Sequence, residues 1–140
     1  MTSLPRITVR EVMTGVPVEI DGMASLGDAL RLMEDHNISA LVVRRRDERD
    51  EYGLLLVSDV AQEIINKGRP SSRTNVYEVM QKPAPAVDAE MDIRYALRQM
   101  SRFGLTHCVV VEARELAGIV TLRDLTMRYI AVAEATSGKA

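Results

Sequence analysis

The sequence of 140 residues has little cysteine, few aromatic residues and no long apolar run. Because the chain has one cysteine, it cannot form an intrachain disulfide. Its two histidines are far apart in the sequence, so they form no cluster of metal ligands with that cysteine. No apolar stretch approaches the roughly 18 residues that a membrane-spanning helix needs, and the N-terminus lacks the apolar core of a signal peptide. We therefore expect no metal site, no membrane partner and a cytoplasmic location.

An excess of one charge is also missing. The chain has 18 Lys and Arg residues against 20 Asp and Glu residues, which gives a net charge of -2. Domains that bind nucleic acid usually carry a basic excess, so RNA or DNA binding is only the weaker alternative. Hydrophobic residues make up 46% of the chain and charged residues 27%, which is typical of a soluble globular domain. Because only 4% are aromatic, the core must consist of Leu, Val, Ile and the eight Met residues.

An internal repeat organises the sequence. A shift of 67 residues aligns residues 9–43 with residues 76–110, and 11 of these 35 positions are identical, against roughly two or three expected by chance. Further along, the offset falls to 65, for the pairs Gly53 with Gly118 and Asp59 with Asp124. The two extra residues fall in the charged run 44–51, which is typical of a solvated hairpin tip that tolerates insertion.

Each copy predicts the element order β-α-β-β-α. Ser25 opens the first helix of one copy, where its spacing to Asp28 fits a capping box, and Asp92 is the matching cap in the other. Apolar residues follow both caps at helical spacing, and the apolar runs after them predict strands that are covered on both faces. The expected strands are 16–20, 40–43, 53–57, 108–111 and 118–120, and the expected second helices are 59–66 and 124–133.

The repeat also predicts the domain organisation. One copy of about 60 residues buries too little surface to be stable alone, so we expect a single α+β (α/β) module in which the two copies pack through their sheets about a pseudo-twofold axis. Its parts are repeat 1 over residues 8–66, a linker over 67–75, repeat 2 over 76–133 and a disordered tail over 134–140.

Three motifs carry a resemblance to a known family. Both copies contain Val-x-Glu-Val-Met and then Ala-Leu-x-x-Met, and the second copy closes with Gly-Ile-Val-Thr-Leu-Arg-Asp over residues 118–124. In this order, over residues 8–132, they resemble a tandem pair of cystathionine-beta-synthase (CBS) motifs, also called a Bateman module. The resemblance implies a regulatory module rather than an enzyme, with no required cofactor. It further implies that an adenosine ligand (AMP, ADP, ATP or S-adenosylmethionine) binds between the repeats, that the helices of both repeats form a homodimer, and that an unknown partner protein is regulated.

The motif Gly118-x-x-Thr121-x-x-Asp124 is the main candidate site. A strand that turns into a helix offers free backbone N–H groups to a phosphate. Asp124 can accept hydrogen bonds from ribose hydroxyls, while Thr121 can donate to a phosphate and Arg123 adds positive charge. The same spacing fits a helix cap by Thr121, so both interpretations stay open. The resemblance assigns ten residues to this site, with Val18 and Ile119 on either side of the base: Thr14, Val16, Pro17, Val18, Ser39, Thr106, Ile119, Thr121, Arg123 and Asp124.

The first copy predicts a second, weaker site. It retains Asp59 but has Leu56 where the second copy has a threonine, and leucine cannot donate a hydrogen bond to phosphate. By the resemblance, Lys82 or His107 can reach a phosphate there. The residues assigned to this site are Lys82, Pro85, Ala86, His107, Leu54, Ser58 and Asp59.

Leu56 also favours an alternative, a structural dimerisation module without a ligand. Such a module would expose apolar residues on the second helix of each copy, namely Ile64, Ile65, Leu125, Met127, Ile130 and Ala131. His107 beside Cys108 suggests thiol or metal chemistry only in isolation, and we interpret this pair as a buried strand cysteine next to a histidine at the edge of the cleft.

Overall fold

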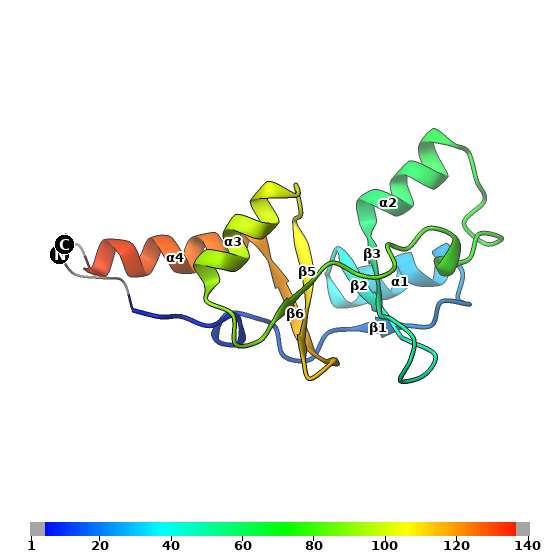
Figure 1. The fold of residues 1–140 in the computed structure, drawn as a ribbon. Coiled ribbons are helices and arrows are strands. Elements are labelled where there is room, and N and C mark those ends of the chain that lie inside the picture. The colour runs from blue at the N-terminus through cyan, green and yellow to red at the C-terminus, as the bar shows by residue number, and fades with distance from the viewer. Residues whose placement is uncertain (1–4, 137–140) are drawn as a thin grey trace. The chain divides into compact units, whose positions relative to one another are not determined.

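The structure, a computed structural model, describes residues 5–136 (Figure 1). These residues form two compact units: unit 1 contains residues 5–16 and 86–136, and unit 2 contains residues 17–85. Each unit has one three-stranded sheet with helices, so the predicted α+β class is confirmed. Within residues 5–136 no helix has both the length and the apolarity that crossing a membrane requires.

Unit 2 contains the sheet of the first repeat. Its strands are β1 (Glu19–Ile20), β2 (Ala40–Val43) and β3 (Gly53–Leu56), in the order β1-β2-β3. Strand β2 pairs in parallel with β1 and antiparallel with β3. The other elements of this unit are α1 (Leu26–His36), α2 (Val57–Ala61), the π-helical turn η2 (Gln62–Asn66) and the 3-10 turn η3 (Val76–Glu78).

Unit 1 contains the sheet of the second repeat. Its strands are β4 (Ala86–Asp88), β5 (His107–Glu112) and β6 (Glu115–Thr121), again with one parallel and one antiparallel pair. A 3-10 turn η1 (Val9–Glu11), α3 (Ile93–Arg102) and α4 (Leu122–Thr136) complete the unit. Helices α3 and α4 contribute Ile93, Ala96, Met100 and Leu125 to a buried core that also includes residues of the sheet and of the N-terminal segment.

The helix starts follow from local chemistry. The Ser25 hydroxyl accepts a hydrogen bond from the Asp28 N–H at 3.0 Å, and the Asp92 carboxylate accepts one from the Arg94 N–H at 2.9 Å. Both predicted caps are therefore confirmed. They satisfy backbone donors that a helix start otherwise leaves without a partner.

The N-terminal segment, residues 5–16, packs on the second repeat rather than on the first. The Val9 N–H donates to the Met91 carbonyl at 2.8 Å, and Thr14 pairs with Ile119. In unit 2 the matching segment, after η3, pairs through Gln81 with Leu54 of the first repeat. The compact units thus differ from the sequence repeats, because each repeat receives the segment that precedes the other.

Several sequence-based element boundaries were wrong. Strand β1 has two residues rather than five, and α2 and α4 each start two residues earlier than predicted. Because α4 continues to Thr136, residues 134–136 are helical rather than disordered, while the remainder of the expected tail, 137–140, lies outside the described residues. Leu125 is fully buried and Ile64 packs against the core, so neither belongs to the exposed apolar face expected of a dimer.

Candidate functional site

The candidate site in unit 1 is built on a close contact between two backbone segments. Thr14 and Ile119 exchange two hydrogen bonds, from the Thr14 N–H at 2.9 Å and from the Ile119 N–H at 3.0 Å. A Cβ atom on Gly118 would lie 2.5 Å from the Thr14 carbonyl oxygen and 2.8 Å from the Met13 sulfur. The glycine of the motif is therefore required for this approach. The contact fixes the N-terminal segment beside the strand that leads to Thr121.

Thr121 caps helix α4. Its Oγ1 accepts a hydrogen bond from the Asp124 N–H at 3.0 Å, and the Leu122 N–H donates to the Thr106 carbonyl at 2.9 Å. The capping interpretation from the sequence is therefore confirmed. It does not use the hydroxyl proton of Thr121, because the oxygen is the acceptor in this bond, and the proton can still be donated.

The Asp124 carboxylate is accessible. Its side chain is 47% exposed, and the Arg123 guanidinium lies 3.6 Å from Oδ1, which is beyond hydrogen-bond distance. A groove of about 340 Å³ beside it is lined by Val12, Met127, Arg128 and Ala131. Arg128 was not among the predicted site residues, although its i+4 spacing from Asp124 on one helix indicates that the two side chains share a face.

His107 lies next to this site within unit 1. It is the cross-strand partner of Thr121, and its Nδ1 lies 2.9 Å from the Thr106 hydroxyl. Burial lowers the pKa of His107 below its usual value of 6.5, and the negative charge of Asp124 opposes this shift. The imidazole is thus favoured in its neutral form, in which one ring nitrogen accepts and the other donates.

The other residues assigned to the main site are divided between the units. Val16, in unit 1, is 87% exposed, and Ile119 is half-buried in β6. Pro17, Val18 and Ser39 belong to unit 2. The structure thus brings together Thr14, Thr106, Ile119, Thr121 and Asp124 within one unit, with Arg123 exposed beside them.

In unit 2 the matching aspartate, Asp59, accepts hydrogen bonds from neighbouring residues. Asp59 Oδ2 accepts hydrogen bonds from Gln81 Nε2 at 3.1 Å and from the Leu56 N–H at 3.4 Å. Leu54 is buried and pairs with the Gln81 backbone, whereas Ser58 is exposed on α2. A ligand at Asp59 would have to compete with the Gln81 amide.

Lys82 forms an ion pair with Asp50. Its Nζ lies 2.8 and 2.9 Å from the two carboxylate oxygens of Asp50, and this contact lowers the pKa of Asp50 below its usual value. Pro85 is half-buried at the end of unit 2, while Ala86 and His107 belong to unit 1. Leu54 thus lies within β3, Ser58 and Asp59 lie in the first turn of α2, and Lys82 forms an ion pair with Asp50.

Cys108 is the buried strand cysteine that the sequence predicts. Cys108 is 1% exposed, and burial raises the pKa of its thiol to about 11, so it stays protonated at neutral pH. Within residues 5–136 no group of three or more His, Cys, Asp or Glu side chains is placed to hold a metal ion.

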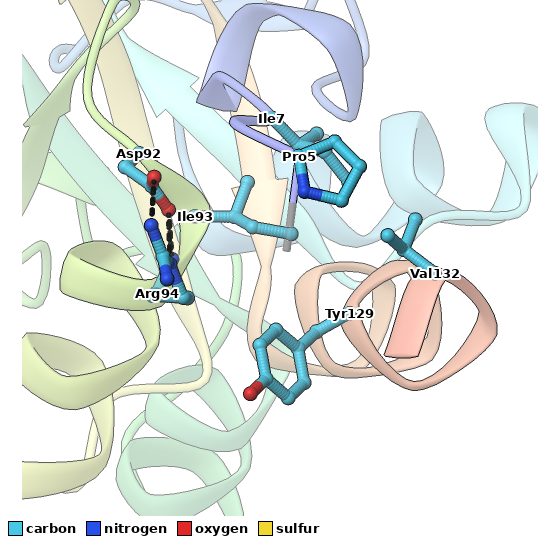
Figure 2. Close-up of a pocket in the computed structure, with 7 residues that line it drawn as sticks. All are labelled: Pro5, Ile7, Asp92, Ile93, Arg94, Tyr129 and Val132. Atoms are coloured by element: carbon cyan, nitrogen blue, oxygen red, sulfur yellow. Dashed lines mark hydrogen bonds and ion pairs between the residues drawn. The ribbon is translucent and has the colours of Figure 1, made fainter. Parts of the chain in front are cut away.

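A second cavity in unit 1 is too small for an organic ligand. It lies where Pro5 and Ile7 meet the start of α3 and the α4 residues Tyr129 and Val132 (Figure 2). Its volume is about 10 Å³, which is room for about one water molecule. The Asp92–Arg94 ion pair, 3.0 Å long, lies at its edge, and the same Asp92 carboxylate caps α3.

Comparison with known proteins decides the family. The CBS domain model matches residues 9–66 and 76–130, in the two repeats. The chain belongs to the CBS-domain family. A relative from Thermofilum pendens, an uncharacterised 33.4 kDa protein in a ribosomal RNA operon, is 28% identical over 132 residues, covering 87% of this chain and 43% of the relative. Across three such relatives the chain spans 32–52% of their length.

Two solved CBS structures are particularly informative. The hexameric CBS-CP12 protein from bloom-forming cyanobacteria has a TM-score of 0.84 and 28% identity, covering 89% of this chain and 72% of that one. The CBS domain of a bacterial CNNM/CorC family Mg²⁺ transporter, in complex with ATP, has a TM-score of 0.74 and 28% identity, covering 88% and 87%. Both are CBS proteins, and one of them binds ATP.

Proposed function

We propose that this CBS pair is a regulatory module that senses an adenosine nucleotide (AMP, ADP, ATP or S-adenosylmethionine) and modulates a partner protein. The nucleotide binds at Asp124. The observation that carries this proposal is the accessible carboxylate in the first turn of α4, beside a groove of about 340 Å³. The ATP complex of the related Mg²⁺ transporter domain supports the ligand class.

Each group at the site has a task in this proposal. Asp124 accepts hydrogen bonds from the two ribose hydroxyls, as acidic residues do in dinucleotide-binding folds. Thr121 donates its free proton to a phosphate, and Arg123, which is exposed, supplies positive charge. Neutral His107 adds a hydrogen-bonding group next to Thr121. Contributions from Pro17, Val18 and Ser39 remain predictions.

Calorimetric titration with AMP, ADP, ATP and S-adenosylmethionine tests the proposal. We expect Asp124→Asn to weaken binding roughly tenfold to hundredfold, because hydrogen bonds to a charged group are worth about 1.5–3 kcal/mol. Asp59→Asn is the matched control, since it makes the same change in the other repeat. Equal affinities of the wild-type chain and Asp124→Asn would overturn the assignment of the site.

A structural assembly module without a ligand is the second candidate. Exposed apolar side chains favour it: Ile65 in η2 is 76% exposed, and Met127 and Ile130 in α4 are 56% and 44% exposed. The relative that forms a hexamer also supports self-association. Light scattering with and without nucleotide separates the two candidates. An oligomer that no nucleotide binds or alters supports assembly alone, and nucleotide binding lost in Asp124→Asn supports sensing.

A further inference from the structure

A third cavity, larger than the two in unit 1, lies wholly within unit 2. Its volume is about 650 Å³, within the range of about 300–1,000 Å³ that is usual for small-molecule sites. It opens where the parallel strands β1 and β2 both end, because the register pairs Ile20 with Val43. Ten residues line it: Asp21, Gly22, Met23, Val43, Arg44, Arg45, Arg46, Tyr77, Met80 and Lys82.

This cavity is separate from the Asp59 region. Strand β3 pairs antiparallel with β2, so that Leu56 lies opposite Ala40 and Gly53 lies opposite Val43. Asp59 follows the Leu56 end, whereas the cavity lies at the Val43 end. Asp59 therefore lies at the other end of the sheet, whereas Lys82, which the sequence assigned to the same site as Asp59, lines this cavity.

The lining combines positive charge with apolar surface. Four basic side chains and a single acidic one line the cavity, although the whole chain has a net charge of -2. Asp50, just outside the lining, offsets part of this charge through Lys82 and, at 3.5 Å, through Arg46. The apolar part includes Met23, which is 70% exposed, and Tyr77, which is 51% exposed. Exposed apolar side chains beside arginines suit a ligand with an apolar body and an anionic group.

The walls are held in place by hydrogen bonds. The Tyr77 N–H donates to the Gly22 carbonyl at 2.9 Å, and the Asn75 side chain donates to the Met23 carbonyl at 2.7 Å. On the other wall, the Arg46 N–H donates to Asp50 at 2.8 Å. These contacts fix the wall that follows β1 against the turn η3, and fix the arginine loop through Asp50 and Lys82. A site whose walls are already fixed loses less entropy when a ligand binds.

The contact of Arg45 with Tyr52 also supports an anionic ligand. Its guanidinium lies 4.9 Å from the centre of the Tyr52 ring, a cation–π distance that orients the side chain. The planar guanidinium groups of arginine bind phosphate, sulfonate or carboxylate oxygens in pairs. Three consecutive arginines at the end of β2 thus place several such groups along one cavity.

We propose that this cavity is a binding site for a small organic anion, an aromatic or aliphatic molecule that carries a phosphate or a comparable acidic group. Arg44 and Arg45 hold the acidic group, and Met23, Tyr77 and Met80 contact the apolar body. The site is independent of Asp124 and acts as a second input to the module.

1-Naphthyl phosphate is the probe for a direct test, because it joins an aromatic body to a dianion. Titration followed through backbone amide NMR shifts should perturb residues 21–23, 44–46 and 77 with a saturable profile. Naphthol alone and inorganic phosphate alone should bind much more weakly, since each satisfies only half of the lining. Saturable shifts confined to other residues, or no saturable shift, would overturn the proposal.

Two variants identify the cavity as the binding site. Arg44→Ala should weaken binding roughly tenfold by removing a charged hydrogen-bond donor. Arg49→Ala is the matched control, because it removes the same charge from the same loop but does not line the cavity. Gly22→Leu should block binding without changing charge, since a Cβ there faces Tyr77 and Val43 at 3.5 and 3.6 Å.

The outcomes also separate this site from the proposed nucleotide site. Asp124→Asn should leave the affinity for 1-naphthyl phosphate unchanged, and Arg44→Ala should leave nucleotide affinity unchanged. If Gly22→Leu disturbs the amide spectrum throughout unit 2, the comparison of Arg44→Ala with Arg49→Ala decides alone. Equal affinities of those two variants would overturn the proposal even if the nucleotide site is real.

Discussion

Asp124 and Asp59 hold matching positions in the two repeats but have different neighbours. Asp59 accepts hydrogen bonds from the Gln81 side chain and the Leu56 N–H, whereas Asp124 has the Arg123 guanidinium at 3.6 Å. The helices that carry them differ as well. Helix α4 is continuous over 15 residues, while α2 has five and then widens into a π-helical turn.

The same motif position therefore has a different environment in each repeat. In unit 2 the aspartate joins the segment after η3 to α2, so it contributes to the fold. In unit 1 the equivalent of Gln81 is Thr14. Its backbone pairs with Ile119 just as the Gln81 backbone pairs with Leu54, but Asp124 stays accessible.

The largest effect should come from Gly118 and Gly53, which directly precede the residues that pair with Thr14 and Gln81. Gly118→Ala should destabilise the chain by about 1–3 kcal/mol, because its Cβ would meet a backbone carbonyl oxygen at 2.5 Å. Gly53→Ala should cost less, since its closest contact, at 2.8 Å, is the flexible Met80 sulfur. Urea unfolding measures both. Gly15→Ala, with no atom within 4 Å, is the neutral control. A larger loss for Gly53→Ala than for Gly118→Ala would reverse the order.

The cap of α4 is specific to the second repeat. Thr121→Val keeps the shape of the side chain but removes the acceptor for the Asp124 N–H, and should cost about 1 kcal/mol. Thr126→Val is the control, because its hydroxyl bonds back to the Leu122 carbonyl within the helix and caps nothing. Thermal unfolding compares the two variants. Equal losses would mean that the cap contributes nothing specific.

The Gln81–Asp59 contact should contribute somewhat less. Gln81→Ala should lower the free energy of unfolding by about 0.5–1.5 kcal/mol, the usual value of one hydrogen bond. The same substitution makes Asp59 resemble Asp124, so nucleotide binding to this repeat should strengthen. Calorimetry on Gln81→Ala combined with Asp124→Asn isolates that effect. The contrast between the repeats is wrong if this double variant binds no better than Asp124→Asn alone.

The smallest effect concerns pH. Burial lowers the folded-state pKa of His107 below 6.5, so the unfolded chain binds more protons in the weakly acidic range. The stability that neutral His107 supports is present above pH 6.5 and is lost as the pH falls through the lowered folded pKa. His107→Gln should therefore flatten the loss of stability between about pH 7 and pH 5. His36→Gln, at an exposed position of α1, is the matched control.

The sequence was most informative where local chemistry decides. Ser25 and Asp92 were predicted as caps because a cap needs only residues that are adjacent in the chain. The four residues of β2 were predicted from their apolar run, and all four are buried. The motifs within the repeat indicated the CBS family, and the family model confirms it.

The errors and omissions arose where distant residues decide. The contact between Gln81 and Asp59 joins residues 22 apart, and no local pattern indicates it. Leu125 was expected on an exposed face, but contacts with residues distant in the sequence bury it in the core of unit 1. The cavity in unit 2 needs the arginine loop, the end of β1 and η3 together, so the charged run was interpreted only as a solvated tip.

The crossed arrangement of these segments has a consequence for isolated repeats. A single repeat made alone would lack the segment that pairs with its own last strand. A second copy would have to supply that segment, so we expect an isolated repeat to be stable only as a pair that exchanges it.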